Sequence, residues 1–270
     1  MPERSTSVYR SARFGSVLWS VRSSGFDHRL SPLLQNPDGA LGRAILLKDS
    51  DACTVGLVDG LVIKRWRPRG WVQALKMLGR GPQAERAGRM ALALESVGVR
   101  TACPLAWGVA ESGLPPKPNY LVTEEIVGEA DLVALDGGRV GRFAAIGRLV
   151  GSLHHAGFAH RDLKPSNIRL LPNGEACLID LDGVSRVAAL SQARAVGDLV
   201  KLGRRVVELA RLRPVDSARL VSAYCDVRGI RKRRSWWQAL KTEALRHEEF
   251  APLAHARWLR VRKETGRQNS

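Results

Sequence analysis

The feature that most constrains this chain is a short polar segment, His160–Asn167, with the sequence HRDLKPSN. Thirteen residues after Asn167, Asp180 ends the apolar run Cys177–Ile179. This order predicts a loop carrying a carboxylate and an amide, faced by a second carboxylate at a strand end. In such a set, one carboxylate accepts the proton of an attacking hydroxyl, while the amide and the other carboxylate hold Mg2+ against phosphates. The segment therefore indicates phosphoryl transfer.

These residues resemble the protein-kinase-like superfamily, whose signature is H-R-D-L-x-x-x-N followed by D-F-G. The resemblance implies that Asp162 is the catalytic base and that Lys164 neutralises the transferring phosphoryl group. It also implies that Asn167 and Asp180 are the ligands of Mg2+ and that ATP is the phosphate donor. The alternative, a chance polar turn, would rarely reproduce this order together with a correctly spaced aspartate.

Two further residues match the nucleotide-binding part of the signature. Lys64, in the predicted strand Leu61–Trp66, resembles the lysine that contacts the α- and β-phosphates of ATP. The resemblance implies a partner for it at the start of the next helix, and we favour Glu85. Glu95 lies near the end of that helix, where a carboxylate opposes the helix dipole. The alternative for Lys64 is a solvated strand lysine beside an arginine.

The phosphate-covering loop and the adenine-contacting hinge are less typical. The loop between the first two strands of the kinase pattern, Lys48–Thr54, contains Ser50 and has no G-x-G-x-x-G. Backbone amides there are still expected to cover the phosphates, although close approach without glycine is harder. The strand Tyr120–Glu124 resembles the one that leads to the hinge, which we place at Val127–Glu129.

The order of the predicted elements indicates an α+β, bilobal, protein-kinase-like fold. We expect residues 1–40 to be a basic N-terminal extension, residues 41–127 a small β-rich N-lobe, and residues 128–270 a larger helical C-lobe with a basic C-terminal tail. Periodicity and turn signals predict strands at 44–48, 54–58, 61–66, 104–108, 120–126, 168–171 and 176–179, and helices at 82–98, 140–157 and 199–212.

Composition narrows the class of protein. The 270 residues are 44% hydrophobic and 26% charged, which excludes wholesale disorder. The chain has no apolar run of the roughly 18 residues that a membrane span needs and no secretory signal pattern. Its four cysteines form no close pair, which is typical of a reducing compartment. We therefore expect a cytoplasmic protein, and the net charge of +17 favours anionic partners.

Departures from the protein kinases point to a different acceptor. The D-F-G position reads Asp180-Leu181-Asp182, with Gly183 one place late, and Asp182 is either a further metal ligand or a turn cap. Only 18 residues separate Asp180 from Asp198, an aspartate that resembles the one bracing the kinase catalytic loop. No A-P-E lies between them, so there is little room for a peptide-binding platform.

These features together resemble the bacterial lipopolysaccharide kinases, the Kdo and heptose kinases. The likeness rests on the segments Ala84–Arg86, Val97–Ala106, Leu153–Phe158 and Leu178–Asp182. It implies ATP-dependent phosphorylation of a sugar hydroxyl of a glycolipid, the lipopolysaccharide inner core, at the cytoplasmic face of the inner membrane. Two alternatives stay open: a Ser/Thr protein kinase, and a non-catalytic pseudokinase or basic scaffold that binds membrane or nucleic acid.

The C-terminal tail carries much of the excess charge. Residues 228–267 contain 12 Lys and Arg against 4 Glu, including the cluster Arg231–Arg234 followed by Trp236 and Trp237. Basic residues beside paired tryptophans fit peripheral contact with an anionic membrane. The alternative is a solvated helix with core tryptophans. The sequence does not favour nucleic acid as a partner, because no nucleic-acid-binding module accompanies the cluster.

Overall fold

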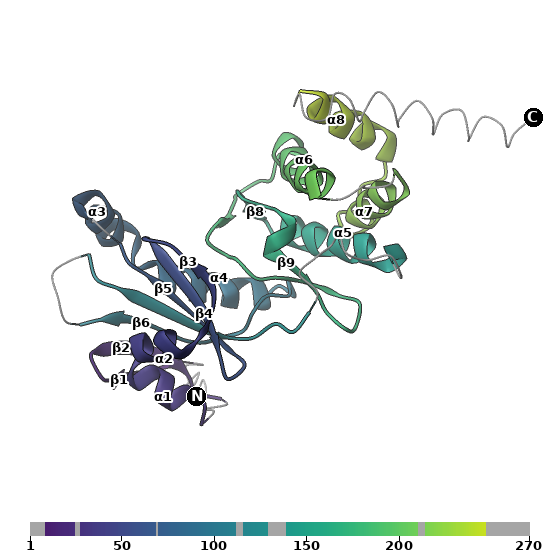
Figure 1. The fold of residues 1–270 in the computed structure, drawn as a ribbon. Helices are drawn as coiled ribbons and strands as arrows, with labels where there is room; N and C mark the ends of the chain where they lie inside the picture. Colours follow the sequence, from purple (N-terminus) through teal and green to yellow (C-terminus); the bar gives the residue numbers. More distant parts are fainter. Residues whose placement is uncertain are drawn as a thin grey trace, which may run out of the picture. The chain divides into compact units, whose positions relative to one another are not determined.

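The computed structural model describes residues 9–24, 28–68, 70–111, 116–128, 139–209 and 214–246. The chain divides into two compact units (Figure 1). Unit 1 comprises residues 1–95 and 102–125, and unit 2 comprises residues 96–101 and 126–270. Unit 1 is built on a sheet and unit 2 is mainly helical, so the expected α+β class is confirmed.

Unit 1 contains an antiparallel sheet whose seven described strands lie in the order β1-β2-β6-β7-β5-β4-β3. Their bounds are β1 Tyr9–Phe14, β2 Val17–Arg22, β3 Ile45–Asp49, β4 Cys53–Val58, β5 Leu61–Trp66, β6 Pro104–Ala110 and β7 Asn119–Glu124. The turn between β4 and β5 contains Asp59 and Gly60, both with positive φ (50° and 72°). This is the tight hairpin that an Asp-Gly pair predicts.

The described part of residues 1–40 differs from the expected extension. Strand β1 pairs with β2, and β2 pairs with β6, so both are integral to the sheet. Helices α1 (Leu30–Gln35) and α2 (Pro37–Arg43) cover one face of this sheet. Leu30, Leu33 and Leu34 are almost fully buried there, in one apolar cluster with Trp19. Each such side chain contributes about 1.5–3 kcal/mol on burial, which explains why this segment packs.

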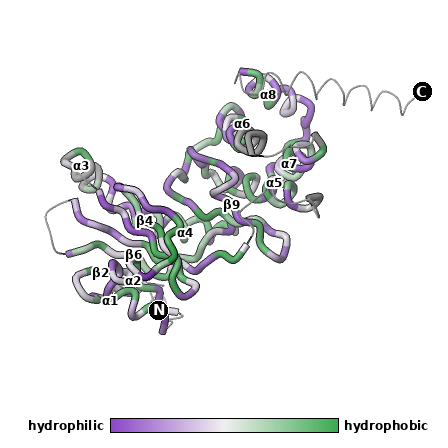
Figure 2. The backbone as a smooth tube through the Cα atoms, in the orientation of Figure 1, coloured by the Kyte–Doolittle hydropathy of each residue, from purple (hydrophilic) through white to green (hydrophobic). Residues whose placement is uncertain are grey.

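Helix α4 (Gln83–Glu95) covers the other face of the sheet. Ala84 and Ala87 pack there with Trp66, Trp107 and Leu121. Figure 2 shows the hydrophobic residues of unit 1 concentrated along these inner strands and helices. A further helix, α3 (Gly70–Arg80), precedes α4 and was not predicted from the sequence. It stands away from the strands in Figure 1.

The described part of unit 2 consists of helices and two short two-stranded sheets, β9–β10 and β8–β11. Its helices are α5 Arg139–His155, α6 Gln192–Leu209, α7 Pro214–Val227, α8 Arg233–Leu245 and the 3-10 turn η1 Pro165–Asn167. Its strands are β8 Phe158–His160, β9 Ile168–Leu170, β10 Ala176–Leu178 and β11 Val184–Arg186. Helices α5 and α7 pack closely, because a Cβ at Gly147 would lie 2.1 Å from the carbonyl oxygen of Leu220.

The described part of the tail, residues 228–246, folds largely into α8. Trp236 is only 7% exposed, and its ring lies 5.4 Å from that of Tyr224 on α7. The tryptophan pair expected to face a membrane therefore includes one core residue. Residues 247–267 of the tail, and Glu129 of the expected hinge, lie outside the described residues.

Two further observations concern the chain as a whole. Cys53, Cys177 and Cys225 are buried, Cys103 is half-buried, and all four are free thiols. Among the helices that the structure describes, none is long and apolar enough to cross a bilayer.

Candidate active site

The loop that follows β8 is held in place by His160. Strand β8 pairs with β11, and His160 lies opposite Val184. The backbone N–H of Asp162 donates to Nδ1 of His160 (3.2 Å), and Nε2 of His160 lies 2.9 Å from the carbonyl oxygen of Asp180. Because Nδ1 accepts, Nε2 carries the hydrogen and the ring is neutral. Burial lowers the pKa of His160 below its ordinary value of 6.5, which favours this neutral form.

Gly183 allows the two ends of this arrangement to meet. A Cβ at Gly183 would lie 2.8 Å from ring atoms of His160 and 3.2 Å from the backbone nitrogen of Asp162. The carbonyl oxygen of Gly183 also accepts from the backbone N–H of Arg161 (2.9 Å). The glycine that falls one place late in the sequence therefore has a steric role here, against the histidine of the loop.

Asp162 and Lys164 form an ion pair on the exposed side of the loop. Nζ of Lys164 donates to Oδ2 of Asp162 at 2.6 Å, and the two side chains are 36% and 62% exposed. The carboxylate is open to a reactant and has a cation beside it. An exposed carboxylate can accept a proton from a reactant, and a cation beside it can neutralise charge on a phosphate group.

Asn167 is buried and has a fixed orientation. Its Nδ2 donates to the carbonyl oxygen of Asp162 (2.9 Å), which leaves Oδ1 as the end of the amide that can coordinate a cation. Its own carbonyl oxygen accepts from the backbone N–H of Ile179 (2.9 Å), next to Asp180. The backbone N–H of Asp182 donates to Oδ1 of Asp180 (3.2 Å), so the Asp180 carboxylate caps the turn that follows it.

The donor set fits Mg2+. An amide oxygen and a carboxylate are hard ligands, and Mg2+ characteristically takes one or two such protein ligands and completes its shell with water and phosphate. No group of three or more His, Cys, Asp or Glu side chains that could hold a metal occurs within the described residues. The expected site thus depends on the pair Asn167 and Asp180.

Unit 1 holds the residues expected to bind nucleotide. Lys64 lies on β5 between Val55 of β4 and Leu121 of β7, and its Nζ is 4.7 Å from the centroid of the Trp66 ring. Glu85, in the first turn of α4, forms an ion pair with Arg89 at 2.9 Å. The proposed ion pair between Glu85 and Lys64 would therefore have to replace the pair between Glu85 and Arg89.

Ser50 lies in a tight turn between β3 and β4. The backbones of Ser50 and Cys53 exchange two hydrogen bonds (3.0 and 3.3 Å), which leaves only Asp51 and Ala52 in the loop. The hydroxyl of Ser50 also donates to the carbonyl oxygen of Cys53 (2.9 Å). The turn is thus closed by its own backbone.

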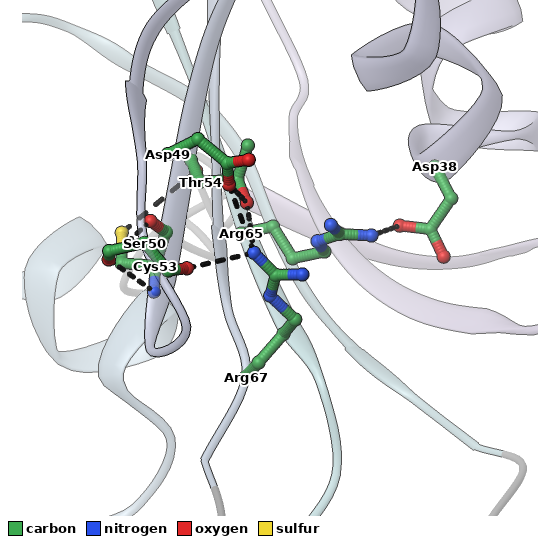
Figure 3. A network of polar contacts seen from close by, with 7 residues as sticks. All are labelled: Asp38, Asp49, Ser50, Cys53, Thr54, Arg65 and Arg67. Carbon is green, nitrogen blue, oxygen red and sulfur yellow. Dashed lines mark hydrogen bonds and ion pairs between the residues drawn. The ribbon is translucent and has the colours of Figure 1, made fainter.

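Arg67 holds this turn from outside it. One guanidinium nitrogen, Nη2, donates to Oδ1 of Asp49 (3.1 Å), to the carbonyl oxygen of Ser50 (2.9 Å) and to Oγ1 of Thr54 (2.6 Å) (Figure 3). The backbone N–H of Arg67 also bonds to Ala52. Sequence analysis did not identify Arg67, because it lies 13 residues beyond the turn and belongs to no motif.

Glu124 is the exposed last residue of β7, opposite Leu61 of β5. The next residue, Glu125, donates its backbone N–H to the carbonyl oxygen of Gly60 (3.0 Å), so the end of β7 is fixed against the β4–β5 turn. Of the candidates, the structure brings Asp162, Lys164, Asn167 and Asp180 together within unit 2, and His160 connects them. Lys64, Glu85, Ser50 and Glu124 belong to unit 1.

The comparison with known families agrees with this arrangement. Residues 75–224, more than half of the chain, match the lipopolysaccharide kinase (Kdo/WaaP) family. The chain belongs to this family. The matched region contains Glu85, Glu124 and all four candidates of unit 2, and it excludes Ser50 and Lys64.

Individual relatives cover part of the chain. Two proteins of Stenotrophomonas maltophilia, strains K279a and R551-3, both named 3-deoxy-D-manno-octulosonic acid kinase, are 37% identical over 130 residues and 38% identical over 114 residues. These matches cover 45% and 39% of this chain and 51% and 45% of the relatives. The chain thus spans about half the length of the curated relatives it matches.

Among solved structures, WaaP in complex with acyl carrier protein is similar to this chain. The TM-score is 0.53 at 21% identity, over 82% of this chain and 98% of that one. At this identity the likeness concerns the fold, and it confirms the kinase-like architecture predicted from the sequence.

Proposed function

We propose that this protein is an ATP-dependent kinase that phosphorylates a sugar hydroxyl of a glycolipid, the lipopolysaccharide inner core. The observation that carries the proposal is the exposed carboxylate of Asp162, 2.6 Å from Nζ of Lys164 and linked through its backbone to His160 and Asn167. Family membership supports the reaction class. The names of the two curated relatives support the octulosonic acid sugar as acceptor.

In this proposal Asp162 orients the acceptor hydroxyl and accepts its proton. The hydroxyl oxygen bonds to the γ-phosphorus of ATP, the bond from that phosphorus to the bridging oxygen breaks, and ADP leaves with the electron pair. Lys164 neutralises charge that develops on the transferring group. The neutral His160 keeps the backbone of Asp162 in place without adding a second cation.

Asn167 and Asp180 are the proposed Mg2+ ligands. The amide oxygen of Asn167 is left available because its nitrogen is bound to Asp162. The ion would supply positive charge against the phosphates of ATP.

The nucleotide contacts are proposed from unit 1. Lys64 would bind the α- and β-phosphates, with Glu85 exchanging Arg89 for Lys64 when nucleotide is present. The turn that contains Ser50 would cover the phosphates, and the backbone around Glu124 would meet the adenine.

A Ser/Thr protein kinase is the less favoured reading. Strand β11 ends at Arg186 and helix α6 begins at Gln192, so the segment between them is five residues long. A peptide platform needs a longer segment, whereas a sugar hydroxyl does not. The presence of Lys64, Asp162, Asn167 and Asp180 together argues against a pseudokinase.

The test compares Asp162→Asn with a matched control. Asp226 is similarly exposed (59% against 62%) and is also paired with a cation, Arg233, so Asp226→Asn removes a comparable carboxylate away from the site. With Mg-ATP and a lipid acceptor bearing 3-deoxy-D-manno-octulosonic acid, we expect Asp162→Asn to lower turnover about 10²–10⁴-fold and the control to retain it. Retained turnover in Asp162→Asn would refute the mechanism, and phosphate on a protein substrate alone would refute the acceptor.

We also propose that the tail makes peripheral contact with an anionic membrane through its charges, without Trp236. Arg231, Lys232 and Arg234 are exposed, whereas Trp236 packs in unit 2. The described tail therefore offers charge to lipid phosphates without that tryptophan as an anchor. A glycolipid acceptor would place the protein at the cytoplasmic face of the inner membrane.

A further inference from the structure

Helix α3 exposes large apolar side chains. Val72 is 45% exposed and Leu75 is 65% exposed. Residues three apart lie on the same face of a helix, so these two form one apolar strip. The helix stands off the strands of unit 1 (Figure 1), and no motif of the family signature falls on it.

The sequence of α3 and its flanks is basic throughout. Residues 67–82 contain Arg67, Arg69, Lys76 and Arg80 and no acidic residue. Arg80, in the last turn of α3, is exposed. A helix with an exposed apolar strip and only basic charges is typical of helices that lie in the interface of an anionic bilayer.

We propose that α3 docks this protein on an anionic lipid surface. Val72 and Leu75 enter the boundary between headgroups and acyl chains, and Arg80 binds lipid phosphate. Because each copy carries a net charge of +17 and would present the same basic helix, a second copy is repelled where a lipid surface is attracted. The helix supplies the apolar anchor that the buried Trp236 does not provide.

This inference rests on the proposed function only for its purpose, which is to bring the site to a membrane-borne acceptor. Lipid binding itself is measured without turnover. The full chain is sedimented with vesicles of phosphatidylglycerol and phosphatidylcholine, and with vesicles of phosphatidylcholine alone. We expect binding to the anionic vesicles that weakens with salt.

The decisive variant is Val72→Ser/Leu75→Ser, which removes the apolar strip from exposed positions and leaves the charge unchanged. Its matched control is Val97→Ser/Leu245→Ser, which removes two apolar side chains of unit 2 that are 46% and 44% exposed. We expect the α3 variant to bind anionic vesicles about tenfold more weakly or worse, and the control to bind like the wild type. Arg231→Gln/Arg234→Gln in the tail removes charge alone. We expect the weakening of vesicle binding in this variant to disappear at high salt, whereas the weakening in the α3 variant persists.

Two results would overturn the proposal. One is unchanged vesicle binding in the α3 variant; if that variant also lost binding to acyl carrier protein, the partner in the WaaP structure, the strip would be assigned to a protein. The other is a dimer in lipid-free solution that the α3 variant dissociates, since that would assign the strip to a second copy. Turnover on a de-acylated, soluble acceptor should be the same in the α3 variant and the wild type, so a failure of α3 docking is distinguishable from a failure of the kinase proposal.

Discussion

The candidate catalytic loop of unit 2 and the β3–β4 turn of unit 1 are stabilised in different ways. In the loop, Lys164 and Asn167 both bond to Asp162, so the contacts fall within a few residues of one another. In the turn, the side chains of Asp49 and Thr54 meet Arg67, which comes from beyond the end of β5. Contacts between residues close in sequence form a recognisable motif, whereas contacts between residues distant in sequence leave no motif by which to find them.

The largest effect should come from a long-range contact of the candidate catalytic loop, the one between Gly183 and His160. Gly183→Ala would place a Cβ 2.8 Å from the ring of His160 and 3.2 Å from the nitrogen of Asp162. We expect a loss of about 1–3 kcal/mol in the free energy of unfolding, measured in urea. Because Asp162 is displaced as well, we also expect turnover to fall about a hundredfold.

Gly203→Ala is the control for this prediction, since a Cβ there meets nothing within 4 Å. Because Gly203 lies inside α6 and alanine is the better helix former, this variant should be as stable as the wild type or up to about 1 kcal/mol more stable, with unchanged turnover. If Gly183→Ala behaved like this control, the loop would be positioned by its local contacts alone.

The same contrast explains what the sequence could predict. Strand Leu61–Trp66 and the Asp-Gly turn before it were predicted as observed, because alternation and turn chemistry are local. The four candidates of unit 2 could be named because they stand at the spacing of the kinase signature that the sequence resembles.

Other features depend on partners far along the chain. Residues 9–22 carry no clear periodicity, and they become strands because β2 pairs with β6, almost 90 residues later. Trp236 beside four basic residues resembles a membrane anchor until Tyr224 is seen to pack against it. Helix α3 lies between two familiar kinase elements where the family signature has no motif, so nothing directed attention to it.

Arg67→Gln tests whether the remote anchor of the turn matters to nucleotide. Three hydrogen bonds from one guanidinium nitrogen would be weakened, and the positive charge beside Asp49 would be lost. If the turn covers the phosphates, we expect the KM for ATP to rise about three- to tenfold with kcat little changed. The side chain is partly exposed, so the loss of stability should stay below about 1 kcal/mol.

Arg13→Gln is the matched control, because Arg13 pairs with Glu111 at 2.8 Å on β1 at the other edge of the same sheet. It should leave the KM for ATP unchanged. An equal change in both variants would mean that Arg67 acts only on the stability of unit 1.

A smaller effect should appear in the pH dependence of stability. At about pH 7.5 and above, His160 is almost entirely neutral in both the folded and the unfolded chain and contributes little pH dependence. As the pH is lowered below 6.5, His160 takes up a proton in the unfolded chain but not in the folded chain. The free energy of unfolding therefore decreases as the pH is lowered, until the pH reaches the lowered pKa of His160 in the folded chain. The slope from this group is at most about 1.4 kcal/mol per pH unit.

Urea unfolding of wild type and His160→Asn, followed between about pH 7.5 and 5.5, isolates this contribution from that of the other histidines. We expect the wild type to lose stability more steeply than His160→Asn over this interval. Parallel curves would show that the proton uptake comes from elsewhere and that the neutral ring is not a requirement of the loop.

The smallest stability effect concerns Glu85, whose observed contact is local and whose proposed contact is not. The pair with Arg89 is an i,i+4 pair with 72% of the arginine side chain exposed, so its removal in Glu85→Gln should cost only about 0.3–0.5 kcal/mol. The proposed exchange of Arg89 for Lys64 makes a separate demand, because a lysine without its carboxylate binds phosphate in poorer geometry. We therefore expect the KM for ATP to rise about tenfold.

Glu95→Gln is the control. It removes the carboxylate that lies 3.6 Å from Arg22, and it should show a similar small loss of stability with an unchanged KM for ATP. If the two variants shared the wild-type KM, Glu85 would stabilise its own helix alone and would take no part in binding ATP.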